Sequence, residues 1–113
     1  MVEWFRRRLD ADEARWCAEQ WHLRQRAARR FPDAGGWRWT AKGLEQATRP
    51  ELAERRARRI ASGLKPGAVV LDLTCGVGSD SRALAEARLQ PIALELDPET
   101  ALAARHNLSL IHI

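Results

Sequence analysis

The sequence is poor in residues that build metal sites and disulfides. Its 113 residues include two cysteines and three histidines. Cys17 and Cys75 stand 58 positions apart without a C-x-x-C partner, and the histidines show no ligand spacing. We therefore expect no metal. Cys75 is interpreted as a small residue in a tight bend, because no histidine or lysine stands close to it in sequence to lower its pKa.

Long apolar runs are also missing. No stretch approaches the ~20 apolar residues that a membrane-spanning helix needs. The opening MVEWFRRRLD is charged and is not followed by the apolar region of a signal peptide. We therefore expect a cytoplasmic protein that does not contact a membrane. At this length we expect a single small domain.

The positive charge is concentrated in the first part of the chain. Residues 1–65 carry a net charge of +7, whereas residues 66–113 carry −3. This half could face nucleic acid, or its arginine-rich helices could simply be solvated. All five tryptophans lie in the first 39 residues, where they could stack on bases or pack in a core. RNA is therefore a candidate partner. For Trp21 the helical spacing favours packing in the core over stacking on bases, because Trp21 falls on one helix face with Ala14 and Ala18.

The first 62 residues predict helices and no strand. Asp10 with Glu13 resembles a helix start, and Thr40 can cap a second helix. The stretch Thr48-Arg49-Pro50-Glu51 resembles a capping box with proline in the first turn. The expected helices span about 11–30, 40–47 and 49–62.

The remainder of the chain alternates between strands and helices. Buried strands are expected at 68–73 and 92–96, because both stretches are short and rich in aliphatic residues. Ser79 or Asp80 is expected to cap the helix between them, and Asp97 before Pro98 predicts a final helix to 107. This β-α-β-α order predicts an α/β fold, the start of a Rossmann-like, doubly wound parallel sheet after an all-helical N-terminal segment.

Three residues are expected to meet where the first two strands end. Ligands bind at the carboxyl ends of strands in such sheets. Gly76 and Gly78 permit close approach of the backbone to a ligand. Glu95 follows Gly76 by 19 residues, close to the ~20-residue offset of a carboxylate that binds ribose hydroxyls. The spacing therefore predicts a nucleoside-containing cofactor.

The residues around these glycines favour one cofactor over another. Ser81 stands where a dinucleotide fingerprint has its third glycine. Asp72 would repel a diphosphate but attract the ammonium and sulfonium charges of S-adenosylmethionine. Other interpretations remain open: Asp72 could cap the turn, Glu95 could be a solvated strand-end carboxylate, and Asp80 could be a helix cap rather than a ligand contact.

Three stretches resemble known methyltransferases. LDLTCGVGSD and ALELDPETALAARHN are similar to the first two motifs of class I S-adenosylmethionine-dependent methyltransferases. WTAKGLEQATRPELAERRARRI resembles the helix before the first strand in actinobacterial methyltransferases with a THUMP-like domain, relatives of the RNA cap guanine-N2 methyltransferase family. The resemblance covers about residues 37–107.

This resemblance implies a set of cofactor-binding residues. The residues around the methionine moiety would be Asp72, Cys75, Gly76 and Gly78. Glu95 would hold the ribose, and Leu96 would lie against the adenine. Thr74, which occupies a place where the family usually has a further glycine, would also bind the cofactor, and Thr48 could approach it from the preceding helix.

The resemblance also implies an N-terminal fragment of a longer enzyme. The family's catalytic turn, an Asn/Asp-Pro-Pro-like motif after a fourth strand, would lie beyond residue 113, so this chain would be inactive alone. The expected organisation is a helical segment at 1–47 and part of a cofactor domain at 48–107. The ending LSLIHI resembles a translated sequencing adapter, so 108–113 is expected to be a non-native tail.

The preferred function is therefore methyl transfer in the parent enzyme, with RNA as the acceptor class. Two alternatives stay open. One is a fragment of an oxidoreductase that binds a nicotinamide or flavin cofactor, and the other is a non-enzymatic, basic RNA-binding module.

Overall fold

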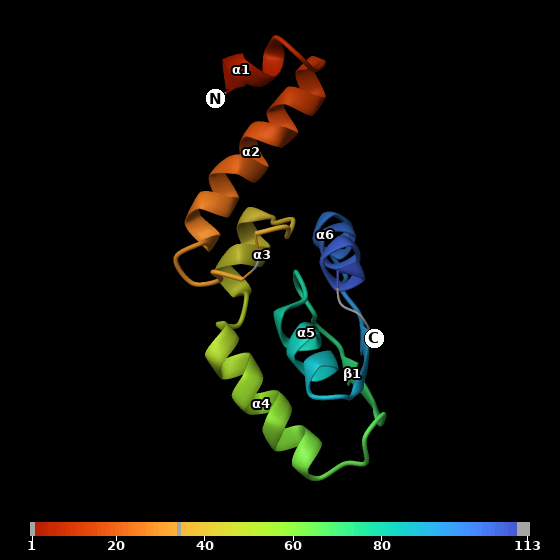
Figure 1. Ribbon diagram of the computed structural model, residues 1–113. Helices are drawn as coiled ribbons and strands as arrows, with labels where there is room; N and C mark the ends of the chain where they lie inside the picture. The colour runs from red at the N-terminus through yellow and green to blue at the C-terminus, as the bar shows by residue number, and fades with distance from the viewer. Residues whose placement is uncertain (1, 34, 111–113) are drawn as a thin grey trace.

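A computed structural model describes residues 2–33 and 35–110 as an α/β arrangement (Figure 1). The elements are α1 (Val2–Arg6), α2 (Ala11–Ala27), α3 (Ala41–Gln46), α4 (Pro50–Ser62), β1 (Val69–Asp72), α5 (Ser79–Glu86), β2 (Gln90–Ala93) and α6 (Pro98–Ser109). The two strands are parallel, with Val69 opposite Gln90 and Asp72 opposite Ala93. The predicted α/β class and the β-α-β-α order are confirmed.

Three of the predicted helix caps are confirmed. The side chains of Asp10, Thr40 and Asp97 each accept a hydrogen bond from the backbone N–H three residues later, at 2.9, 2.9 and 3.0 Å respectively. Each cap satisfies an N–H group that the first turn of a helix leaves free. The helix after Asp10 ends at Ala27 rather than near residue 30, and the N–H groups of Arg30 and Phe31 both bond to the carbonyl of Ala27 in the turn that follows.

Two other predicted caps are wrong. Arg49 stands at the N-cap of α4 and makes no side-chain cap, because the hydroxyl of Thr48 donates instead to Asp80 Oδ2 at 2.8 Å. Gly78 stands at the N-cap of α5 in a left-handed conformation, with φ of 108°. Neither Ser79 nor Asp80 therefore caps this helix, and the Thr48–Asp80 bond instead joins the segment before α4 to the first turn of α5.

Two apolar clusters hold the chain together. The first joins α2 and the segment before α3 to the loop after β1 and to α6, and comprises Leu23, Ala27, Phe31, Trp37, Trp39, Leu44, Val77 and Ala103. The second lies between α4 and α5 and comprises Ala53, Ala57, Ala83, Leu84 and Leu89. The N-terminal helices and the β-α-β-α part thus share a core; the boundary expected at residue 47 stays a prediction.

The tryptophans divide between packing and exposure. Trp37 and Trp39 are buried in the first cluster, whereas Trp4, Trp16 and Trp21 are 40–54% exposed. The predicted burial of Trp21 is wrong. The core-facing side of α2 includes Gln20 instead, whose side-chain amide exchanges two hydrogen bonds with the backbone of Trp39.

α6 is fixed by a buried asparagine. Asn107 Nδ2 donates to the carbonyls of Arg38 and Val77 at 2.9 and 2.8 Å, and its Oδ1 accepts from the N–H of Arg38 at 2.7 Å. The helix continues through Ser109, two residues beyond the predicted end, and Leu108 packs near Gly78. Residues 111–113 of the expected tail lie outside the described residues.

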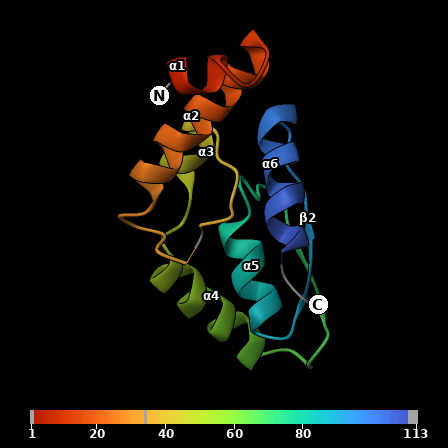
Figure 2. The ribbon, with the colours of Figure 1, turned by 45° about the horizontal axis from the view of Figure 1, so that its top comes forward.

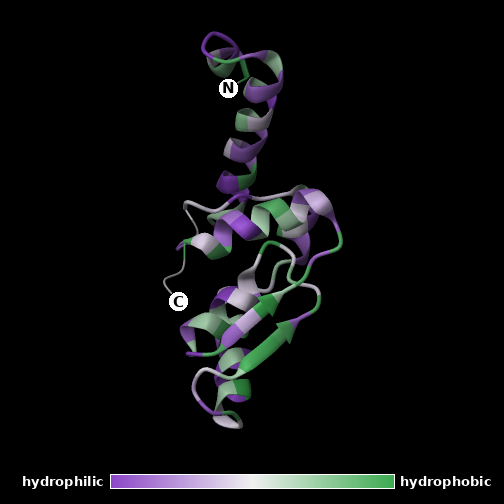
Figure 3. Ribbon diagram, turned by 90° about the vertical axis from the view of Figure 1, so that its right-hand side faces the viewer, coloured by the Kyte–Doolittle hydropathy of each residue, from purple (hydrophilic) through white to green (hydrophobic). Residues whose placement is uncertain are grey.

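The sheet is covered on one face. α5 packs on the strands and α4 packs on α5, and Figure 2 shows these two helices side by side. The opposite face turns toward the viewer in Figure 3. Its side chains are 48–65% exposed: Val69, Leu71, Leu73, Ile92 and Leu94.

The expectation of fully buried strands is therefore wrong for the described residues. α6 packs on the loop after β1 and on the segment before α3, and it does not cover the second face of the sheet. β2 also begins earlier than predicted, because the N–H of Gln90 already bonds to the carbonyl of Ala68. Among the helices described, none is long and apolar enough to cross a membrane.

Candidate functional site

The loop after β1 exposes backbone where the sequence predicted it. Gly76 and Gly78 both have positive φ, at 56° and 108°, a conformation that residues with a Cβ rarely adopt. A Cβ added at Gly76 would meet nothing within 4 Å among the described residues, whereas one at Gly78 would lie 3.2 Å from Leu108. Gly76 therefore leaves open space beside its Cα for the close approach of a ligand, and Gly78 gives room to α6.

Glu95 joins the ends of the two strands. Its Oε1 accepts from the N–H of Gly76 at 3.0 Å, and its Oε2 accepts from the N–H of Asp97 at 2.9 Å. An ionised carboxylate has about four lone-pair sites. Glu95 therefore holds the loop in place and keeps acceptor capacity for two hydroxyl groups of a ligand.

A cavity of about 260 Å³ opens beside this loop. Its walls come from the loop after β1 with the first turn of α5, from the residues after β2 with the first turn of α6, and from α3 with the residues that follow it. Four of the seven predicted cofactor-binding residues line it: Thr74, Cys75, Gly76 and Glu95. Thr48, which the resemblance brought near the cofactor, lines it too.

The other three predicted residues lie outside this lining. Asp72 Oδ2 accepts from the hydroxyl of Ser81 at 2.6 Å, and Asp72 lines a neighbouring cavity of about 190 Å³ between α4, α5 and β1. Gly78 is turned toward α6, and the side chain of Leu96 is 97% exposed. Contacts of these residues with a cofactor stay predictions.

Sequence reasoning missed the wall that α3 contributes. Lys42 and Gln46 line the cavity from this helix, and their spacing of four residues puts them on one helix face. Gly43 allows α3 to lie against the loop, since a Cβ there would come within 2.6 Å of Val77 Cγ1. The predicted cap at Thr40 could have located this wall, because it fixes where α3 starts. The start of the helix in turn puts Lys42 and Gln46 on one face.

Acidic side chains dominate the charge of the cavity. Asp80, Glu95 and Asp97 line it together with one cation, Lys42. Hydrogen bonds from the side chain and backbone of Thr100 hold the pKa of Asp97 below its ordinary value. The lining therefore favours a cationic ligand and disfavours a diphosphate.

Asp80 and Cys75 are two further polar side chains of the lining. Asp80 Oδ1 is buried without a hydrogen-bond partner among the described residues, and Arg56 Nη1 stands 3.8 Å away. Burial, and then the nearby carboxylates of Asp72 and Glu95, raise the pKa of Cys75 to about 11. Cys75 is thus a neutral thiol at neutral pH and not an activated nucleophile.

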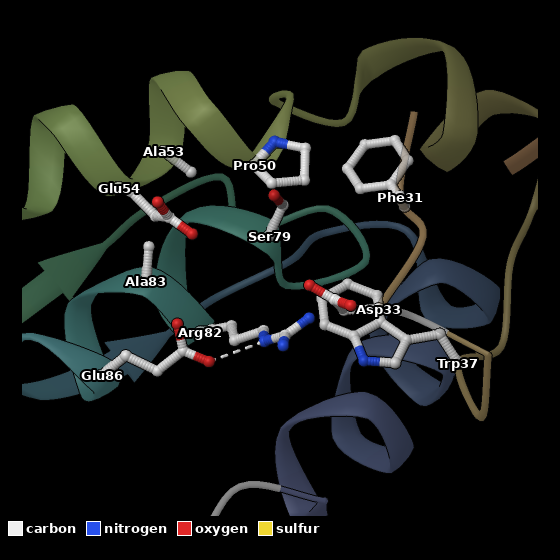
Figure 4. A pocket seen from close by; sticks show the side chains of 10 residues that line it. All are labelled: Phe31, Asp33, Trp37, Pro50, Ala53, Glu54, Ser79, Arg82, Ala83 and Glu86. Atoms are coloured by element: carbon white, nitrogen blue, oxygen red, sulfur yellow. Dashed lines mark hydrogen bonds and ion pairs between the residues drawn. The ribbon is translucent and has the colours of Figure 1, made fainter. Parts of the chain in front are cut away.

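A smaller cavity lies between α4, α5 and the side chains of Phe31, Asp33 and Trp37 (Figure 4). Its volume is about 40 Å³, which accommodates only a few water molecules. In Figure 4 the side chain of Arg82 lies between Glu86, to which its Nε bonds at 2.9 Å, and Trp37. This cavity is a small packing gap between these segments.

No cluster of three metal-ligating side chains occurs within the described ranges.

Comparisons with known proteins find relatives of the chain as a whole. No protein-family model matches the chain. Two Mycobacterium tuberculosis proteins, from strains CDC 1551 and H37Rv, are each named an uncharacterized S-adenosylmethionine-dependent methyltransferase. Both are 38% identical to the chain over 106 residues, which is 88% of this chain and 28% of each relative.

A solved structure shows the same arrangement. The crystal structure of a protein described as a methyltransferase from Porphyromonas gingivalis W83 superposes with a TM-score of 0.81 at 29% identity, covering 94% of this chain and 26% of that one. The chain spans about a quarter of the length of the proteins it matches. Its sequence and fold are therefore similar to one part of proteins named S-adenosylmethionine-dependent methyltransferases, whose cofactor is the one that the sequence predicted.

Proposed function

We propose that this chain carries the cofactor-binding part of an S-adenosylmethionine-dependent methyltransferase. The observation that carries the proposal is the acid-lined cavity beside Gly76, whose missing Cβ leaves open space. S-adenosylmethionine presents a sulfonium and an ammonium group, which three carboxylates attract, and its sulfonium supplies the methyl group. The same carboxylates disfavour a nicotinamide or flavin dinucleotide.

Each part of the cofactor has a candidate partner in the lining. Glu95 would accept hydrogen bonds from the ribose hydroxyls, and Gly76 would approach through its backbone. Lys42, the single cation of the lining, would pair with the carboxylate of the methionine moiety. Asp72 would contribute negative charge from beside the cavity, and Leu96 would lie against the adenine.

The methyl acceptor in this proposal is RNA. Support comes from the net charge of +7 over residues 1–65, which favours a polyanion, and from the resemblance to THUMP-like-domain methyltransferases and to the cap guanine-N2 family. The family's catalytic motif follows a fourth strand, and the described residues contain two strands. No residue of this chain is therefore assigned a catalytic role. A cytoplasmic location belongs to the same proposal.

Calorimetric titration of S-adenosylhomocysteine into the purified chain and a Glu95→Gln variant tests the cofactor site. The substitution keeps the size of the side chain but removes the charge that strengthens hydrogen bonds from hydroxyl groups. We expect Glu95→Gln to weaken binding about tenfold or more, since a hydrogen bond to a charged group contributes roughly 1.5–3 kcal/mol.

Glu51→Gln is the matched control, because Glu51 is exposed in the first turn of α4 and does not line the cavity. Circular dichroism establishes that both variants fold. Unchanged affinity in a folded Glu95→Gln variant, or an equal loss in Glu51→Gln, would contradict the assignment of Glu95.

A further inference from the structure

Two buried threonines join the start of α3 to the start of α6. Thr40 caps α3, and Thr100 lies 60 residues later, in the first turn of α6. Their side-chain hydroxyls are 3.1 Å apart, and the two residues are 7% and 4% exposed. Solvent therefore has little access to the hydrogen bond between them.

The neighbouring hydrogen bonds determine which of the two hydroxyls donates. A threonine hydroxyl has one proton and two lone pairs. The hydroxyl of Thr100 donates its proton to Asp97 Oδ2 at 2.6 Å. In the contact between the threonines the hydroxyl of Thr40 is therefore the donor, while its oxygen accepts from the N–H of Gly43 at 2.9 Å. These three bonds, which we call the hydroxyl chain, run in one direction from the backbone of α3 to the carboxylate of Asp97.

Both ends of the hydroxyl chain reach the cofactor cavity. Asp97 lines the cavity at one end, and Gly43 lines it beside Lys42 at the other. The charge of Lys42 adds to the hydrogen bonds from Thr100 that hold the pKa of Asp97 below its ordinary value. The cation and the carboxylate thus lie close enough to interact, although one belongs to α3 and the other precedes α6.

Loss of one hydroxyl would disturb the whole hydroxyl chain. Valine has nearly the shape of threonine but forms no side-chain hydrogen bond, so it would leave a buried partner unsatisfied. Hydrogen bonds in a chain also polarise one another. Removal of the Thr40 hydroxyl would therefore weaken the bond from Thr100 to Asp97, which Thr40 reaches only through Thr100.

We propose that Thr40 and Thr100 are positioning residues of the cofactor cavity. Their hydroxyls hold α3, which carries Lys42, against the start of α6, and so fix the place of Lys42 relative to Asp97. Neither hydroxyl has a proton left for a ligand, so the two threonines act through Lys42 and Asp97. The inference rests on the proposed function for the identity of the ligand.

Calorimetric titration of S-adenosylhomocysteine into four variants tests the effect on the cavity: Thr40→Val, Thr40→Ser, Thr100→Val and Thr100→Ser. The net contribution of one hydrogen bond corresponds to a factor of roughly 2 to 10 in an equilibrium constant. We therefore expect each valine variant to bind about threefold to tenfold more weakly than the unmodified chain. Each serine variant should retain most of the affinity, because serine keeps the hydroxyl. Thr100→Val leaves the cap of α3 in place, so its weaker binding separates the hydroxyl chain from the cap.

Nuclear magnetic resonance of the Asp97 carboxyl carbon over a range of pH tests the hydroxyl chain without a ligand. Both valine variants should have a higher pKa at Asp97 than the unmodified chain, because the bond from Thr100 is lost or weakened. Both serine variants should keep the lower pKa. The other charged side chains of the lining are Lys42 from α3, Asp80 from α5 and Glu95 after β2, and all variants retain them.

Asp10→Ala is the matched control, because it removes the cap of α2 and Asp10 does not line the cavity. We expect this variant to be less stable but to keep the affinity for S-adenosylhomocysteine and the pKa of Asp97. Circular dichroism establishes that each variant folds, and if Thr40→Val does not fold, Thr100→Val decides the outcome.

Three results would overturn the proposal: unchanged affinity in the folded valine variants, an unchanged pKa of Asp97 in them, or equal losses of affinity in Asp10→Ala. Failure of the proposed function gives a different result. An unmodified chain that does not bind S-adenosylhomocysteine, together with a raised pKa of Asp97 in the valine variants, contradicts the methyl-donor site and supports the positioning of Asp97 by the two threonines.

Discussion

At the scale of single residues, Glu95 and Gly76 form the part of the site that the sequence locates best. A positive-φ glycine after one strand and a carboxylate after the next must meet in a parallel sheet, because both strands end at the same edge. Their hydrogen bond of 3.0 Å is therefore a consequence of spacing. Lys42 could not be located in this way, since it reaches the cavity only through the packing of α3 on the loop.

The raised pKa of Cys75 predicts a loss of stability in alkali. The pKa of this thiol is about 11 in the folded chain, against 9.0 for an unperturbed thiol. Between these pH values the unfolded chain loses the proton first, so the contribution is complete below pH 9 and falls as the pH rises toward 11.

Urea unfolding of the chain and of a Cys75→Ala variant at pH 8 and pH 10 measures this effect. The free energy of unfolding should fall more between the two pH values in the unmodified chain than in Cys75→Ala, because only the former carries the thiol. Lysines titrate in both proteins and cancel in the comparison. An equal fall in both proteins would contradict the assigned environment of Cys75.

At the scale of elements, the contact between α3 and the loop after β1 depends on one glycine. A Cβ at Gly43 would lie 2.6 Å from Thr40 Oγ1, which caps the helix, and 2.6 Å from Val77 Cγ1, which is buried. Neither atom can withdraw freely, because the hydroxyl is engaged in the cap and valine is stiff at χ1. The helix would have to move away from the loop.

We expect Gly43→Ala to destabilise the chain by about 1–3 kcal/mol, the usual cost of overpacking, and to weaken S-adenosylhomocysteine binding. Thermal unfolding and calorimetry measure the two effects. Gly35→Ala is the control, since a Cβ at Gly35 would meet none of the described residues within 4 Å. A Gly43→Ala variant with the Tm of the unmodified chain would show that α3 does not pack on the loop in this way.

Local chemistry predicted some elements well and others poorly. Asp97 before Pro98 marks the start of α6, because a capping side chain and a proline in the first turn act within a few residues. Thr48 shows the limit of such patterns. Its hydroxyl could have capped α4 but bonds to Asp80, which lies 32 residues further along the chain, in α5. Only the folded chain brings these two residues together.

At the scale of the whole molecule, the uncovered face of the sheet is the main liability. Leu71 and Ile92 are opposite each other in the register and both are exposed on this face. Each strand also has one unpaired edge in the two-stranded sheet, and exposed apolar strands promote association. We therefore expect the isolated 113-residue chain to self-associate.

Light scattering after size-exclusion chromatography measures this association. A Leu71→Lys/Ile92→Lys double variant should remain monomeric at concentrations where the unmodified chain associates, because the two charges oppose apolar contact. Leu110→Lys is the control, as Leu110 is exposed at the end of α6, away from the sheet. A monomeric unmodified chain would contradict the expectation.

The extent of this apolar face was not predictable from the strand sequences. Short aliphatic runs are typical of strands buried on both faces, and Val69 and Leu71 fit that pattern. Whether a helix covers the second face depends on where α6 packs, and the buried amide of Asn107 directs α6 to the segment before α3 instead. Long-range hydrogen bonds of this kind leave no local pattern in the sequence.

The most direct test of the central claim is calorimetric titration of the chain with S-adenosylhomocysteine beside NAD⁺. The acid-lined cavity predicts saturable, one-to-one binding of S-adenosylhomocysteine and no measurable binding of NAD⁺, whose diphosphate the carboxylates repel. Binding of NAD⁺ instead, or failure of a folded chain to bind S-adenosylhomocysteine, would contradict the assignment of this site to a methyl donor.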